Sequence, residues 1–217
     1  ANWAVGTPAL TTTLRGTVRA VVTVRTLKHS VHSGMFGGAA PDALTTMCRL
    51  MAELHDAEGN VAVPGLDASE DTEIEYDADQ LRSDAGMLPG TQLIGSGPLT
   101  SRLWLKPSIT VIGIDAPGVD VASNTLTASA RAKLSLRVAP SQDPQAAFDA
   151  LKKHLEDAAP WGAEVNVELD ELGAGFSADA NGPVVLGYTI GDGHGGSVAQ
   201  TASFTVTPVN DAPRAQD

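Results

Sequence analysis

The sequence has little of several residue types on which particular folds and activities depend. Cys48 is the only cysteine, which excludes an internal disulfide and a zinc site built from cysteines. Aromatic residues make up 4% of the chain, so Val, Leu, Ile and Ala have to fill the core. No apolar run approaches the ~18 residues of a membrane span, and the first residues lack the basic and hydrophobic regions of a signal peptide.

Basic residues are also few. The 217 residues include 14 Lys and Arg against 26 Asp and Glu, which gives a formal net charge of −12. A chain of this charge repels phosphate groups, so nucleic acids and anionic membranes are excluded as expected partners. The acidic residues are scattered along the sequence, which is typical of a solvated, soluble surface.

Alternating apolar and polar residues predict four strands. Residues 14–25, 131–138 and 163–169 alternate with a period of two, as half-buried strands do. Residues 107–114 are apolar on both faces, which predicts a strand that is buried or lies at an interface. The inward-facing residues are expected to be Leu14, Val18, Ala20, Val22, Val24, Ala132, Leu134, Leu136, Val138, Val165, Val167 and Leu169.

Two segments have the spacing of amphipathic helices. The first begins behind Pro41 and stops at Gly59. Cys48 falls within its apolar spacing, which predicts that it is a core residue and not a nucleophile. The second begins at Asp143 as N-cap, with Pro144 behind it. The apolar residues expected on the inner faces are Leu44, Met47, Cys48, Met51 and Leu54, and Phe148, Leu151 and Leu155.

The predicted order is β-α-β-β-α-β, with an insertion of short elements at about residues 60–106. This order predicts an α+β, ferredoxin-like sandwich, in which two helices cover one face of a four-stranded antiparallel sheet. An edge strand or a helix could pair with a second copy. Residues 183–217 change in character and predict a C-terminal β-hairpin tail around a Gly-rich turn. The predicted domains are therefore 1–182 and 183–217.

Five segments, in order, resemble one family. They are "NWAVGTPALTTTLRG", "VHSGMFGG", "PSITVIGI", "SNTLTASARAKLSLRVAP" and "PWGAEV". Over about residues 1–182 the chain resembles the lid, or dimerisation, domain of the di-zinc peptidase family that contains carnosine dipeptidases, aminoacylases and carboxypeptidase G. In that family this domain is inserted between two halves of a zinc-binding catalytic domain.

The resemblance implies roles for three residues. His32 matches the family histidine that reaches into the partner's active site and stabilises the tetrahedral intermediate. Asn124 and Arg137 match residues that bind the carboxylate end of a dipeptide or N-acyl amino acid. An imidazole N–H can donate to an oxyanion, and an arginine fork suits a carboxylate. Thr127 stands where the family usually has proline, and His29 is expected only at a solvent-facing strand end.

The family's zinc motifs are missing from the sequence. The family uses a His-x-Asp pair and a Glu-Glu pair among its zinc ligands and catalytic base, and neither occurs in the 217 residues. Zinc is therefore expected in the parent family but not in this chain alone. The zinc-binding catalytic domain of the family is expected to be absent from this chain. The chain is predicted to be a homodimer that is inactive by itself.

The tail resembles something different. Residues 183–217 resemble the last strands and linker of cadherin-like tandem repeats of bacterial surface adhesins, which implies a chimera. Calcium would then bind to Asp192, Asn210 and Asp211. The segment is about 30 residues long, whereas a complete sandwich repeat needs on the order of 90–100. A plain hairpin with Asp-Gly and Gly-Gly turns explains the same residues.

Three functions stay open at this point. The first is the dimerisation and lid portion of a zinc dipeptidase or amidohydrolase, which implies a cytoplasmic location. The second is a non-catalytic binding or adhesive module, which implies a secreted or cell-surface location. The third is an independent enzyme, for which Glu75, Asp77 and Asp79 would have to meet His29 or His32 in space.

Overall fold

The computed structural model describes residues 2–4, 7–8, 11, 13–70, 72, 74–177, 182–191 and 197–206. The chain divides into two compact units, Leu14–Gly175 and a second unit formed by Ala1–Thr13 with Phe176–Asp217. Within the described ranges, no helix has the length and apolar character needed to cross a membrane. The predicted boundary near residue 182 stays a prediction.

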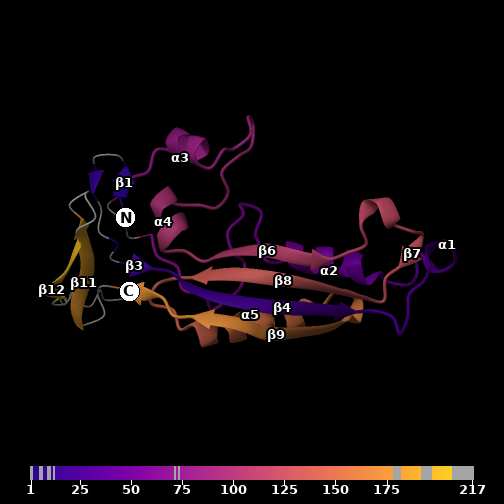
Figure 1. The fold of residues 1–217 in the computed structure, drawn as a ribbon. Helices are drawn as coiled ribbons and strands as arrows, with labels where there is room; N and C mark the ends of the chain where they lie inside the picture. Colours follow the sequence, from indigo (N-terminus) through magenta and orange to yellow (C-terminus); the bar gives the residue numbers. More distant parts are fainter. Residues whose placement is uncertain are drawn as a thin grey trace, which may run out of the picture. The chain divides into compact units, whose positions relative to one another are not determined.

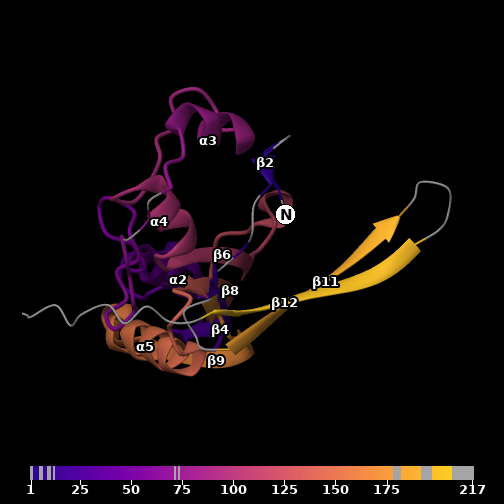
Figure 2. The same ribbon diagram turned by 90° about the vertical axis from the view of Figure 1, so that its left-hand side faces the viewer.

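A four-stranded antiparallel sheet forms the centre of the larger unit (Figure 1). Its strands lie in the order β6-β8-β4-β9, and their bounds are Ser108–Asp115, Ser129–Val138, Gly16–Arg25 and Glu164–Gly173. Helices α2 (Ala43–Ala52) and α5 (Pro144–Asp157) lie together on one side of this sheet, as Figure 2 shows. The predicted combination of helices with an antiparallel sheet is confirmed.

The two central strands have the predicted alternation. Every second residue of β4 from Gly16 to Val24 is buried, and β8 pairs with it without a shift from Gly16 opposite Val138 to Arg25 opposite Ser129. The buried set is the one that the alternation predicts, apart from one residue. Leu14 is 58% exposed, because it precedes β4 and is not covered by the helices.

Helix α2 confirms the first predicted helix but not the place of its cysteine. The helix begins at Ala43 with Asp42 as N-cap, and its C-cap is Glu53, so it ends earlier than Gly59 suggested. Its buried face consists of Ala43, Thr46, Met47 and Leu50. The prediction that Cys48 is a core residue is wrong, because it lies one position beyond Met47 and turns about 100° away to an exposed face.

Helix α5 confirms the second predicted helix. Asp143 accepts a hydrogen bond from the backbone N–H of Gln145, and Pro144 occupies the first turn. Phe148, Leu151 and Leu155 are buried against the sheet, as their spacing predicts.

The two edge strands are less covered than predicted. Val167 of β9 is buried, but Leu169 is 41% exposed, because β9 continues beyond the part that α5 covers. On β6 only Ile109 is buried, whereas Val111, Ile112 and Ile114 are 40%, 51% and 44% exposed. Of the two predicted places for the apolar residues of β6, burial within the chain is correct for Ile109 and wrong for the other three, for which an interface remains.

The remaining elements of the larger unit are short. The insertion contains α3 (Ala78–Asp84) and α4 (Leu99–Trp104), which confirms the expectation of short elements. At the far end of the sheet lie β5 (Val31–His32), α1 (Ser33–Phe36), the 3-10 turn Val119–Val121 and β7 (Thr125–Leu126). A second 3-10 turn, Pro160–Gly162, leads into β9.

The tail contains the predicted hairpin. Strands β11 (Gly182–Gly191) and β12 (Ser197–Val206) pair antiparallel in continuous register. The short strands β1 (Asn2–Ala4), β2 (Thr7–Pro8), β3 (Thr13–Leu14) and β10 (Phe176–Ser177) complete the described elements. The calcium ligands proposed from the sequence, Asp192, Asn210 and Asp211, lie outside the described residues.

Candidate functional site

The His32 side chain is held by the loop that it begins. His32 ends β5 and serves as N-cap of α1, where its Nδ1 accepts a hydrogen bond from the backbone N–H of Gly34 at 3.0 Å. A nitrogen that accepts carries no hydrogen, so Nε2 is the nitrogen that carries it in the neutral ring. The side chain is exposed and has no other hydrogen bond among the described residues. It can therefore donate from Nε2 to a group outside this chain.

Two glycines leave room for the close contacts of this loop. A Cβ on Gly34 would lie 2.9 Å from Cε1 of His32, so any other residue would displace the ring. A Cβ on Gly37 would lie 2.4 Å from the carbonyl oxygen of Ser33, which is the hydrogen-bond partner of the Gly37 N–H. The "HSGMFGG" segment is therefore shaped to present an imidazole at its first position.

Asn124 lies next to His32 although the two are far apart in the sequence. Strand β5 pairs with β7, which places His32 opposite Thr125, and the Ser33 N–H donates to the Asn124 carbonyl at 2.9 Å. Both residues are exposed. Figure 1 shows α1 and β7 together at one end of the sheet. The structure thus brings two of the three predicted site residues together.

Asp42 and Thr127 support this end of the molecule, and the sequence reasoning did not identify them as a pair. Asp42 accepts from the Thr45 N–H at 2.7 Å, and from the N–H and hydroxyl of Thr127 at 2.6 and 2.8 Å. The Thr127 hydroxyl in turn accepts from the Leu44 N–H. Burial raises the pKa of Asp42, but these hydrogen bonds outweigh it and hold the pKa below its ordinary value. The polar residue at the family's proline position therefore ties β7 to α2.

Replacing Asp42 by alanine should lower the free energy of unfolding by about 2 kcal/mol, because it removes a helix cap and the acceptor for Thr127. Since the folded-state pKa of Asp42 is lowered, its stabilisation is present above the unfolded-state value of about 3.9 and is lost as pH falls through the folded value. Urea unfolding of wild type and variant at several pH values measures this, and the difference should shrink at acidic pH. Asp77→Ala, at the cap of the exposed helix α3, is the control and should cost less.

Arg137 lies at the opposite end of the sheet from His32. It is the last but one residue of β8, is exposed, and is opposite Thr17 of β4 and Ser108 of β6. The strand rises about 3.3 Å per residue, so Arg137 is about 26 Å from Ser129 at the other end of β8. One chain therefore cannot bring His32 and Arg137 to the same small substrate.

The acidic residues of the third functional hypothesis do not assemble into a metal site. Asp77 caps α3 and accepts from the N–H groups of Asp79 and Gln80. In the part of the chain that the structure describes, no group of three or more His, Cys, Asp or Glu side chains is placed to hold a metal ion. His29 is exposed near the end of β4, as predicted. The described residues therefore offer no ligand set that fits zinc.

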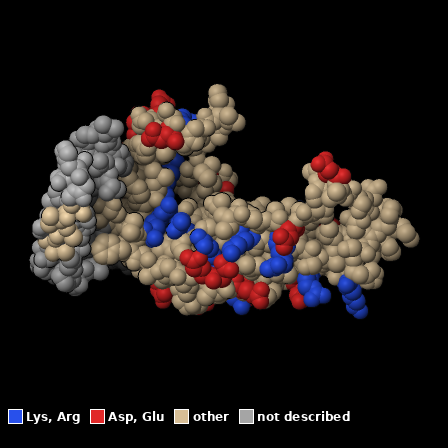
Figure 3. All heavy atoms as spheres, viewed as in Figure 1, with Lys and Arg blue, Asp and Glu red and all other residues tan. Residues whose placement is uncertain are grey.

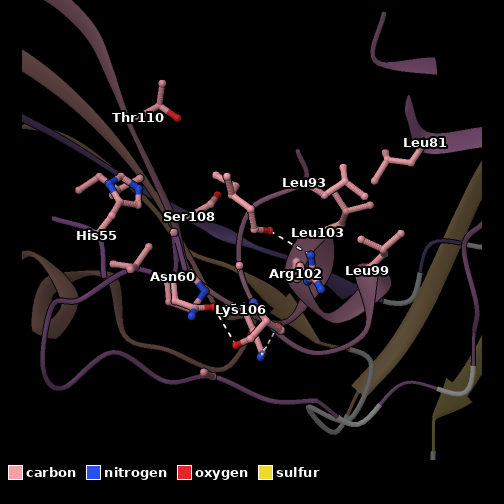
Figure 4. Close-up of a pocket in the computed structure, with 18 residues that line it drawn as sticks. His55, Asn60, Leu81, Leu93, Leu99, Arg102, Leu103, Lys106, Ser108 and Thr110 are labelled. Atoms are coloured by element: carbon pink, nitrogen blue, oxygen red, sulfur yellow. Dashed lines mark hydrogen bonds between the residues drawn. The ribbon is translucent and has the colours of Figure 1, made fainter. Parts of the chain in front are cut away.

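A cavity of about 440 Å³ lies between the insertion and the start of β6 (Figure 4). Its wall is mainly apolar and includes Leu93, Leu99 and Leu103. Two cations at the wall point to backbone oxygens. Arg102 donates to the carbonyls of residues 94 and 97, and Lys106 to that of residue 96 and to the Glu70 carboxylate. These cations hold the insertion together.

Comparison with known proteins gives a match over residues 12–163 to the peptidase dimerisation domain. The chain belongs to this family. The chain is 37% identical over 199 residues to the Cysteinylglycine-S-conjugate dipeptidase of Corynebacterium striatum, a match that covers 89% of the chain and 44% of the relative. It is 25% identical over 168 residues to a Cys-Gly metallodipeptidase of Saccharomyces cerevisiae, covering 71% of the chain and 35% of the relative.

Solved structures of dipeptidases have the same fold as the peptidase dimerisation domain. The di-peptidase Dug1p of Saccharomyces cerevisiae matches with a TM-score of 0.63 and 21% identity, over 79% of this chain and 40% of that one. Human carnosine dipeptidase 1 matches with a TM-score of 0.61 and 23% identity, over 78% and 39%. The chain spans less than half the length of these relatives. The predicted resemblance to the peptidase family is confirmed, and the cadherin-like resemblance of residues 183–217 stays a prediction.

Proposed function

We propose that this chain is the dimerisation and lid portion of a zinc-dependent dipeptidase or amidohydrolase, and that it completes active sites in a dimer. The observation that carries the proposal is the separation of the site residues to opposite ends of one sheet. The strand order β6-β8-β4-β9 with two helices on one face supports the ferredoxin-like assignment. Relatives named as dipeptidases and metallodipeptidases support the reaction class.

The edge strand β6 is the proposed dimer interface. No described strand pairs with its outer side. Its apolar residues Val111 and Ile114 are on the same side of the sheet as α2, but they are exposed because α2 covers β4 and β8 and not β6. Helix α2 packs on those inner strands and leaves the edge uncovered. An unpaired edge of this kind is a template for another strand. A second copy would satisfy its backbone groups and bury its apolar side chains.

A two-fold axis at this edge would bring the separated residues together. Two copies of β6 that pair antiparallel place the start of one strand beside the end of the other. Ser108, at the start, is opposite Arg137, whereas the end of β6 leads through the 3-10 turn to β7 and the His32 loop. Arg137 of one subunit then faces the end that carries His32 of the partner subunit and Asn124 of the partner subunit.

In such a composite site each side chain has a distinct task. The Nε2–H of His32 would donate to the oxygen that becomes negative when the amide is attacked. The Asn124 side chain would offer a further amide donor, and the Arg137 fork would hold the carboxylate end of a dipeptide or N-acyl amino acid. Zinc is proposed as the metal of the separate catalytic domain, where it would activate the attacking water.

The adhesive alternative has no support among the relatives reported above, and neither has calcium binding by the tail. The proposal of a composite active site requires a homodimer, so the oligomeric state of the chain tests it. Sedimentation equilibrium of the whole chain should give about twice the 22.3 kDa of one chain at micromolar concentration. A strictly monomeric chain at 100-fold higher concentration would remove the basis for a composite site.

A further inference from the structure

Two arginine side chains come together at the end of the sheet where β4 and β6 begin and β8 ends. Arg137 is opposite Thr17 on β4 and Ser108 on β6. Arg15, two residues before Thr17, donates from Nη1 to the Ser108 hydroxyl at 3.0 Å and to the Lys106 carbonyl at 3.3 Å. These two bonds hold the Arg15 guanidinium over the strand pair that carries Arg137.

The two positive charges repel each other. Arg15 is half-buried, and its pKa is lowered by burial first and then by the charge of Arg137. Arginine remains charged in proteins at neutral pH all the same. Within the described ranges, neither guanidinium has a carboxylate partner. A partly buried charge without a counter-ion is unfavourable, so the pair favours an anion from outside.

Three other cations on the same face of the sheet have carboxylate partners. Figure 3 shows a row of Lys and Arg side chains along this face, with Asp and Glu side chains beside them. The ion pairs are Arg19–Glu171 at 2.5 Å, Lys133–Asp170 at 2.8 Å and Arg131–Asp115 at 3.8 Å. The lack of a carboxylate at Arg15 and Arg137 is therefore not a general property of this face.

Hydrogen-bond donors at this point are in excess. Arg15 uses Nη1 alone, which leaves Nε and Nη2 without partners among the described residues, and Arg137 has no hydrogen bond there at all. The Thr17 hydroxyl, directly opposite Arg137, is buried and is not hydrogen-bonded in the described part of the chain. A carboxylate has two oxygens that each accept more than one bond, which matches two guanidinium forks.

We propose that Arg15 and Arg137 bind one carboxylate together, and that Arg15 is a second determinant of specificity for substrates with a free C-terminal carboxylate. The part of this inference that names the substrate rests on the proposed function, whereas the anion site itself does not. Since each guanidinium contributes its own donors, a neutral amide at the same position of the ligand leaves both charges without a counter-ion.

Binding of N-acetylglycine and of its neutral analogue N-acetylglycinamide to the whole chain tests the site. Both are titrated at constant ionic strength and followed by NMR chemical shifts. We expect millimolar binding of the acid and none of the amide. Arg15→Gln should weaken binding of the acid at least about 10-fold, and Arg137→Gln should do the same.

Arg25→Gln is the matched control, because Arg25 lies on the same face of β4 at its other end, exposed. It should leave the affinity unchanged. Arg15→Lys keeps the charge but loses the fork, so intermediate affinity is expected. If Arg137→Gln weakens binding of the acid and Arg15→Gln does not, the role of Arg15 is wrong and that of Arg137 stands. Binding of neither compound by wild type, or equal loss in Arg25→Gln, overturns the site, and sedimentation of the same samples tests the dimer separately.

Discussion

Lysine at both Val111 and Ile114 is expected to convert the proposed dimer into a monomer. Both side chains lie on the edge strand β6, whose outer side pairs with no described strand, and they are 40% and 44% exposed in one chain. In the proposed dimer two ammonium groups per subunit would be removed from water without a partner, which costs several kcal/mol. We expect the dissociation constant to rise at least about 100-fold, equivalent to about 2.7 kcal/mol.

Leu169→Lys is the matched control for this variant. Leu169 lies on β9, the opposite edge of the same sheet, and is 41% exposed. Sedimentation velocity over a concentration series measures the association of all three proteins, and thermal unfolding checks that each is folded. Dissociation by Leu169→Lys with no effect of the β6 variant would place the interface at β9. A dimer that survives both changes would place it on a helix.

The second large expected effect is that two inactive variants regain activity when their subunits are mixed. A chimeric enzyme in which residues 14–175 replace the matching segment of the Corynebacterium striatum dipeptidase provides a catalytic domain. In it, His32→Ala and Arg137→Ala should each lower kcat/KM about 10²- to 10³-fold, because each removes a donor to a developing or fixed charge. Mixing the two after dissociation should restore activity.

The expected recovery follows from symmetry. Random exchange gives heterodimers in about half of the molecules, and one of their two sites combines an intact His32 with an intact Arg137, so about one quarter of wild-type activity returns. Mixing His32→Ala with Asn124→Ala is the control, because both residues belong to the same end and every site stays damaged. No recovery in the first mixture would mean that the site residues act within one subunit.

The elements that alternation and capping predicted are those in which local pattern and burial agree. Strands β4 and β8 are central and covered by helices on one face, so period-two burial appears in them almost without exception. Asp143 with Pro144 begins α5 for a local reason, a side-chain cap and a fixed backbone angle. Leu14 and Leu169 were misplaced because their exposure depends on how far the helices cover the sheet, which the pattern does not contain. Cys48 was misplaced because the helix packs on the sheet through Met47, one position away, and the spacing alone did not decide between the two.

The sequence by itself determined the pattern of the main strands and helices and the likeness to a peptidase domain, because alternation, helical spacing, caps and short motifs are local features of the chain. Only the tertiary structure decided which residues meet. His32 and Asn124 are far apart along the chain but are joined by the pairing of β5 with β7. Asn124 and Arg137 are close in sequence but separated, because an extended strand carries the chain about 3.3 Å per residue to the other end of the sheet.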